Sequence, residues 1–306
     1  MSKTIIFFGN ERLATGVSTD LPIIKALVLN GYTIAAIIVT PSLINPSRKQ
    51  KISEIADFAS TKNIPLIEYT NQESIIDILA SYKPTIGILA SFGKIIPQAV
   101  IDLFPFGIIN IHPSLLPKHR GPIPIEAPLL MGERQTGVTI MQLVKEMDAG
   151  PIYDQQIVEL KGTETKQDLA NKLDQLGAKR LIYCLPNILN GTLKPTPQSS
   201  NATYDKKITK KMSILNFNKS ADILEREVRA FIGWPRSMTT INSKPLTITQ
   251  SHVVKYAGSK PSTPIVIDGQ LAIETNDGAL IIDRLIPAGS KEMDSKEYLK
   301  GHTIKP

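Results

Sequence analysis

The feature that most constrains the fold is a regular alternation, over the first third of the chain, of short apolar runs with segments of helical periodicity. The apolar runs, rich in β-branched residues, cover 5–8, 34–39, 65–68 and 86–90, and the helical segments cover 21–29, 53–61 and 72–81. Strands that are apolar throughout are typical of a sheet buried on both faces. Helices between them supply the crossovers that parallel strands need. The pattern predicts an α/β fold with a mostly parallel, Rossmann-like sheet, which residues 107–111 continue as a further strand.

The turn after the first apolar run argues against a dinucleotide site. It reads Gly9-Asn-Glu-Arg-Leu-Ala-Thr-Gly16, whereas the dinucleotide fingerprint needs glycines where the backbone approaches a pyrophosphate. Glu11 and Arg12 occupy that stretch instead. We therefore expect a Rossmann-like sheet that binds no NAD.

The rest of the chain indicates a second, smaller domain. A helix is predicted at 124–131, paired strands at 136–143 and 151–160, and a long helix at 164–189. Residues 190–203 have the Gly, Pro and small polar composition of a linker. Beyond them, a helix at 220–231 and short strands at 246–249, 263–268, 271–275 and 280–285 predict a small OB-like β-barrel. The predicted domains are thus 1–189 and 204–306, joined by the linker 190–203.

Composition limits the classes of partner and site. The net charge is +7, and residues 201–306 carry 16 Lys and Arg against 11 Asp and Glu, so most of the surplus falls on the smaller domain. Such a surplus favours an anionic partner or merely a soluble surface. The single cysteine, Cys184, excludes a disulfide framework, and the four histidines lack metal-ligand spacing. With no apolar run long enough for a leader or a membrane span, we expect a cytoplasmic protein with no metal, and Cys184 as a packed small hydrophobe.

An amide and an imidazole stand two residues apart at the end of a predicted strand, in Asn110-Ile-His112. Residues two apart point to the same face of a strand, and open α/β sheets place their sites at the carboxyl ends of strands. An amide donor beside an imidazole suits an oxyanion site for acyl transfer. Asp148, in a loop closed by Gly150, could orient the imidazole. We expect His112 and Asp148 to lie in an open cleft rather than in the core. The alternative is a hydrogen-bonded structural histidine and an ordinary turn aspartate.

The motifs around these residues resemble those of the formyltransferases that use 10-formyltetrahydrofolate. The resemblance rests on the run from Asn110 to Gly121, on Pro124-Ile, on Thr136-Gly-Val-Thr-Ile-Met-Gln and on Met147-Asp-Ala-Gly. It implies that Asn110, His112 and Asp148 are the catalytic residues and that no metal is needed. It also implies that the folate lies near the end of the 86–90 strand, the turn after His112 and the loop through Asp148. The residues expected to bind it are Ile88, Leu89, Ala90, Ser91, Phe92, Gly93, Ser114, Leu115, Leu116, Pro117, Met147, Ala149 and Gly150.

Within this superfamily the chain is most similar to the methionyl-tRNA formyltransferases, because the resemblance continues past the linker. It includes Ala202-Thr-Tyr-Asp-Lys-Lys-Ile, Trp234-Pro and Asp277-Gly-Ala-Leu-Ile-Ile. This implies transfer of the formyl group to the α-amino group of methionyl initiator tRNA, in translation initiation, by a monomer. Phosphate contacts are expected from Arg48, Lys49, Lys51, Lys206, Lys207, Lys210 and Lys211, for which the alternative is a solvated surface.

The chain departs from the family pattern at several places, which include the segment 40–51, shorter and without the usual glycines, and Pro122-Ile-Pro, where small residues are usual. Gly9-Asn-Glu-Arg replaces a turn of the Gly-Thr-Pro type, and His119 stands where the tRNA enzymes commonly have an aromatic residue. The competing enzyme reading is a formyltransferase acting on a sugar-nucleotide amine with the same folate. A hydrolase that releases formate, and a tRNA-binding protein with a decayed catalytic domain, are further alternatives.

Overall fold

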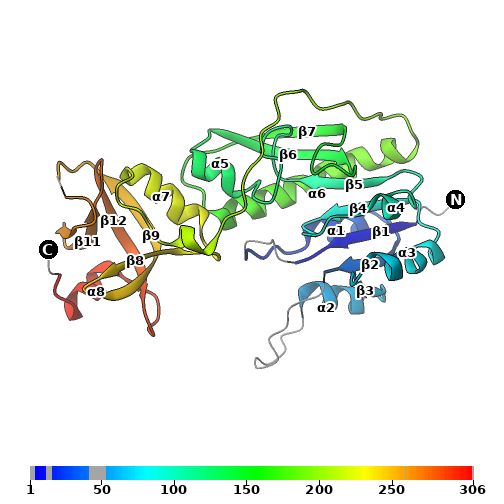
Figure 1. Ribbon diagram of the computed structural model, residues 1–306. Coiled ribbons are helices and arrows are strands. Elements are labelled where there is room, and N and C mark those ends of the chain that lie inside the picture. Colours follow the sequence, from blue (N-terminus) through cyan, green and yellow to red (C-terminus); the bar gives the residue numbers. More distant parts are fainter. Residues whose placement is uncertain (1–3, 12–15, 41–52, 259, 305–306) are drawn as a thin grey trace. The chain divides into compact units, whose positions relative to one another are not determined.

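The computed structural model describes residues 4–11, 16–40, 53–258 and 260–304 (Figure 1). The chain divides into two compact units. The first consists of Met1–Ile125, Gln135–Glu159 and Asp168–Lys206, and the second of Glu126–Arg134, Leu160–Gln167 and Lys207–Pro306. Two short segments from within residues 1–189 thus group with the C-terminal residues. The predicted domain ranges 1–189 and 204–306 stay a prediction.

The first unit is built on a seven-stranded sheet with the order β3-β2-β1-β4-β5-β6-β7. The strands from β1 to β5 pair in parallel, whereas β5, β6 and β7 pair antiparallel. This confirms the predicted α/β fold with a mostly parallel sheet. The strands are β1 (Ile5–Gly9), β2 (Ile34–Val39), β3 (Leu66–Glu68), β4 (Ile86–Ala90), β5 (Ile108–His112), β6 (Gln135–Gln142) and β7 (Ile152–Glu159).

Four helices of this unit, α1, α2, α3 and α6, lie in the predicted segments, and nearby side chains cap α2 and α3. Ser53 accepts from the Ala56 N–H at 3.3 Å, and Asn71 accepts from the Ser74 N–H at 2.9 Å, which satisfies donors that have no partner within the helix. The helices are α1 (Pro22–Leu29), α2 (Glu54–Thr61), α3 (Gln72–Ser81), α4 (Gln98–Ile101) and α6 (Lys166–Leu189). Among the described residues, none of the helices combines the length and the apolarity needed to cross a membrane.

The second unit holds a six-stranded antiparallel sheet, with the order β10-β11-β12-β9-β8 and β13 paired to β12. This confirms the small, barrel-like β domain. Its elements are α5 (Glu126–Met131), the 3-10 helix η1 (Lys210–Ser213), α7 (Ala221–Ala230), β8 (Ser237–Ile241), β9 (Lys244–Val254), β10 (Pro264–Ile267), β11 (Gln270–Glu274), β12 (Ala279–Pro287), β13 (Met293–Asp294) and α8 (Ser295–Gly301). Two hairpins turn through residue pairs of positive φ, Asn242-Ser243 and Asp268-Gly269, the geometry that matches the twist of antiparallel strands.

Cys184 lies on α6 with 1% of its surface exposed, which confirms the prediction of a packed small hydrophobe. Burial raises the pKa of its thiol from the ordinary 9.0 to about 11. Because the thiolate is the reactive form, the folded protein should react negligibly with an aromatic disulfide reagent at pH 8, and completely once denatured. Absorbance of the released thiol measures this. Rapid reaction of the folded protein at pH 8 would contradict the assigned burial.

Candidate active site

The carboxyl end of β5 presents the predicted amide and imidazole together. Asn110 pairs with Met141 of β6, and His112 pairs with Thr139, so both side chains leave the same face of the strand. Asn110 is 7% exposed and His112 is 4% exposed. The expectation that the imidazole lines an open cleft was wrong, because the chain following β5 folds back over the ring.

Asp148 lies against the imidazole, although 36 residues separate the two in sequence. Its Oδ1 is 3.7 Å from His112 Nδ1, an ion-pair distance, and its Oδ2 accepts a hydrogen bond of 2.8 Å from the Gly121 N–H. The backbone at Asp148 has a φ of 52°, a left-handed conformation that aspartate tolerates better than most residues. The carboxylate thus joins the ring to the turn that covers it.

The opposite nitrogen of the same ring also faces an oxygen. His112 Nε2 lies 3.2 Å from the carbonyl oxygen of His119, which can only accept a hydrogen bond. With a carboxylate on one side and a carbonyl on the other, the surroundings accommodate a ring that carries hydrogen on both nitrogens. That is the form able to stabilise negative charge on a neighbouring atom.

The residues predicted to hold folate on β4 lie at the carboxyl end of that strand and in the turn after it. Asn10 fixes this turn: its Nδ2 donates to the carbonyls of Ser91 at 3.1 Å and Phe92 at 3.0 Å. Its Oδ1 accepts from the N–H of Thr40 at 3.2 Å and from the Thr40 hydroxyl at 3.1 Å. This role of Asn10 was not predicted from the sequence. The signal was the amide itself, placed at the end of β1 between two neighbouring strands.

The turn that begins at Ser114 is held by side chains of β6 and β7. Thr139 Oγ1 donates to the Ser114 carbonyl at 2.7 Å and accepts from the Leu116 N–H at 3.2 Å. Gln155 Nε2 donates to the Leu116 carbonyl at 2.7 Å and to Thr139 Oγ1 at 2.9 Å. These bonds therefore fix the backbone of the predicted loop 114–117.

The loop around Asp148 is equally constrained at Gly150. A Cβ at that position would lie 1.8 Å from the Gln142 carbonyl oxygen, so only glycine allows the backbone to pass. Met147, by contrast, is 57% exposed. Whether Met147, Ala149 and Gly150 contact folate stays a prediction.

Comparison with known proteins settles the family. Residues 21–185 match the model described as "Formyl transferase", and residues 207–303 match "Formyl transferase, C-terminal domain". The chain belongs to the formyl transferase family. A methionyl-tRNA formyltransferase of Bacillus velezensis is 32% identical over 311 aligned residues, which cover 99% of this chain and 96% of the relative.

Solved structures with the same fold include other formyltransferases. The N-formyltransferase of Helicobacter canadensis, in complex with folinic acid and dTDP-3-aminofucose, has a TM-score of 0.68 at 21% identity, covering 92% of this formyltransferase and 99% of that chain. HypX from Aquifex aeolicus, in complex with tetrahydrofolic acid, has a TM-score of 0.66 at 19% identity, covering 100% of this chain and 49% of that one.

The basic residues predicted to contact tRNA fall in two places. Arg48, Lys49 and Lys51 lie outside the described residues. The side chains of Lys206, Lys207, Lys210 and Lys211 are all exposed, the last two in η1. Their contact with tRNA stays a prediction.

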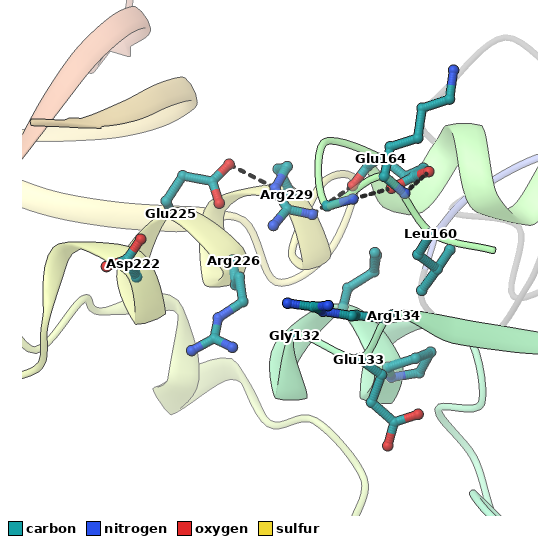
Figure 2. A pocket seen from close by; sticks show the side chains of 13 residues that line it. Gly132, Glu133, Arg134, Leu160, Glu164, Asp222, Glu225, Arg226 and Arg229 are labelled. Carbon is teal, nitrogen blue, oxygen red and sulfur yellow. Dashed lines mark hydrogen bonds and ion pairs between the residues drawn. The ribbon is translucent and has the colours of Figure 1, made fainter.

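A hollow of about 690 Å³ lies within the second unit of this formyltransferase. Side chains of α7 line one side, and residues 132–134 and 160–164 line the other (Figure 2). Arg229 pairs with Glu225 at 2.6 Å and donates to the Glu164 carbonyl at 2.8 Å, while the Glu164 carboxylate accepts from the N–H groups of Lys161 and Gly162. These groups hold α7 to the segment 160–164, and none of the predicted site residues lines the hollow.

Proposed function

We propose that this chain transfers the formyl group of 10-formyltetrahydrofolate to the α-amino group of methionine esterified to initiator tRNA. The observation that carries the proposal is the grouping of Asn110, His112 and Asp148 at the end of β5. The substrate rests on the names of relatives that match both units, and translation initiation is the process in which it would act. The cytoplasmic location, the monomeric state and the absence of a metal stay predictions.

The residues assigned to the folate fit a flat, polar heterocycle. The turn Ser91-Phe92-Gly93 has its backbone fixed by Asn10. Apart from Gly93 and its two chain neighbours, no described residue has a heavy atom within 4 Å of the point where a Cβ of Gly93 would stand. Open space beside an ordered backbone lets main-chain N–H and C=O groups determine orientation, as small-molecule sites commonly do. Residues 88–93, 114–117 and 147–150 would hold the donor there.

When bound, 10-formyltetrahydrofolate supplies the formyl group: the bond from the formyl carbon to N10 breaks, and a bond from that carbon to the substrate amine forms. The amine loses one proton and N10 gains one. Asn110 would donate its amide N–H to the formyl oxygen as that oxygen gains negative charge. His112, protonated at both nitrogens, would add positive charge beside the same oxygen. Asp148 would keep the ring oriented through Oδ1 and assist loss of the amine proton.

Formylation of methionyl initiator tRNA by the purified protein tests the proposal. We expect turnover with the tRNA, and a fall in kcat of about 10²- to 10³-fold in Asn110→Ala, because one oxyanion donor is lost. Asn187→Ala, at an exposed position on α6, is the matched control and should remain at the wild-type rate.

A dTDP-linked amino sugar, assayed with the same folate, provides the competing substrate. Turnover of the sugar without turnover of the tRNA would replace the proposed acceptor by a sugar-nucleotide amine. Wild-type activity in Asn110→Ala with either substrate would reject the proposed role of the amide.

A further inference from the structure

The side chain of Gln198, in the segment predicted to be a linker, reaches the loop that carries Asp148. Its Nε2 donates to the Asp148 carbonyl at 2.8 Å and to the Gly150 carbonyl at 2.7 Å. An amide nitrogen carries two hydrogens, so both are used on this one loop. All of these residues belong to the first unit.

The oxygen of the same amide binds the turn on the other side of the site. Gln198 Oε1 accepts from Arg120 Nε at 3.1 Å and from Arg120 Nη2 at 2.7 Å. Arg120 is 8% exposed and is itself held, because its Nη1 donates to the Tyr204 hydroxyl at 2.7 Å. Its backbone N–H donates to the Thr203 carbonyl at 3.0 Å.

Together these hydrogen bonds form a closed network that includes Asp148. Gly121, the residue after Arg120, donates its N–H to Asp148 Oδ2, while Gln198 joins Arg120 to the backbone of Asp148. Asp148 is thus held both at its side-chain carboxylate and at its main-chain carbonyl. Since the left-handed backbone at Asp148 belongs to no regular element, these contacts set where Oδ1 stands relative to His112.

We propose that Gln198 is a positioning residue, which holds Asp148 at the distance from His112 that formyl transfer needs. The inference rests on the proposed function. The alternative is a purely structural role, in which Gln198 only fastens residues 196–205 to the rest of the first unit. The two roles predict different effects of removing Gln198 from a variant that already lacks the Asp148 carboxylate.

Two substitutions separate the halves of the amide. Gln198→Ala removes every bond, whereas Gln198→Glu keeps an acceptor for Arg120 and places a carboxylate oxygen against the carbonyls of Asp148 and Gly150. We expect kcat to fall in both variants, by up to about 100-fold, because displacements of about 1 Å have effects of that size. KM for the tRNA should stay within about twofold of wild type. Gln175→Ala, exposed on α6, is the matched control and should not change kcat.

The decisive comparison adds Gln198→Ala to Asp148→Asn. If Gln198 acts through the carboxylate, the double variant should be no slower than Asp148→Asn alone, because residues that act as one unit are not additive. A loss in the double variant equal to the product of the two single losses would overturn the proposal. So would wild-type kcat in Gln198→Glu.

Hydrogen exchange gives a reading that needs no substrate. In Gln198→Ala, peptides covering 145–151 and 117–122 should exchange faster than in wild type, with β1 and β4 unchanged. Faster exchange confined to 196–205 would support simple fastening and reject the proposal. If wild type fails to formylate methionyl-tRNA, the proposed function fails, and the exchange result still decides whether Gln198 holds the loop.

Discussion

Asp148→Asn is expected to lower kcat for formylation by about 10²- to 10⁴-fold, the range of a lost acid–base group, with little change in stability. Its amide oxygen can still accept the Gly121 N–H that now binds Oδ2. The NH₂ group would then face His112 Nδ1, which must become an acceptor, so the ring could no longer carry hydrogen on both nitrogens. An isosteric substitution would therefore leave the imidazole ring neutral, a form that stabilises an oxyanion less well. Steady-state formylation kinetics measure the effect.

His112→Ala should be at least as slow, since the ring itself is removed. Asp77→Asn, at an exposed position on α3, is the matched control for loss of one negative charge and should keep wild-type kcat. Near-normal turnover in either Asp148→Asn or His112→Ala would reject the mechanism, provided that circular dichroism shows an intact fold.

Lys166→Met is expected to destabilise the second unit by about 3 to 5 kcal/mol, the usual cost of leaving one partner of a buried ion pair alone. Lys166 is fully buried, with Nζ 3.6 Å from Glu126 Oε1 and 3.0 Å from the Trp234 carbonyl oxygen. Burial lowers the pKa of Lys166, and the charge of Glu126 opposes that shift. Without the ammonium group, the Glu126 carboxylate, which is 2% exposed, would lose the opposite charge that Lys166 provides.

Urea unfolding followed by tryptophan fluorescence would measure the loss, because Trp234 is the one tryptophan in the sequence and belongs to the second unit. Lys296→Met, exposed on α8 of the same unit, should leave the midpoint almost unchanged. The double variant Glu126→Met with Lys166→Met should recover most of the loss, because apolar replacement of a whole buried pair is often neutral. An unshifted midpoint in Lys166→Met would contradict the importance of the pair.

The periodicity of the sequence predicts the first unit well, because its strands are apolar throughout. The run at 34–39 became β2 without any change of bounds. The periodicity predicts the second unit less well. β8 was missed because Ser237-Met-Thr-Thr-Ile241 is largely polar, and its pairing depends on the two-residue turn at Asn242 and Ser243.

For the candidate site, alternation along a strand placed Asn110 and His112 on one face. The loop closed by Gly150 made Asp148 a candidate, and the family resemblance strengthened that assignment, since no local rule brings a loop back across β6 to the end of β5. Gln198 escaped prediction for the same reason. Fifty residues separate it from Asp148, and the small polar composition of 190–203 indicates irregular backbone without indicating which hydrogen bonds that backbone makes.

The division of the chain has a consequence for exchanging parts between members of the family. Because 126–134 and 160–167 belong to the second unit, the chain passes between the units five times, and only the last passage lies near the linker. A chimera joined at residues 190–203 would combine one parent's α7 and Trp234 with the other parent's Glu126 and Lys166. Compatible hybrids therefore require three grafted segments, with both halves of the buried ion pair taken from a single parent.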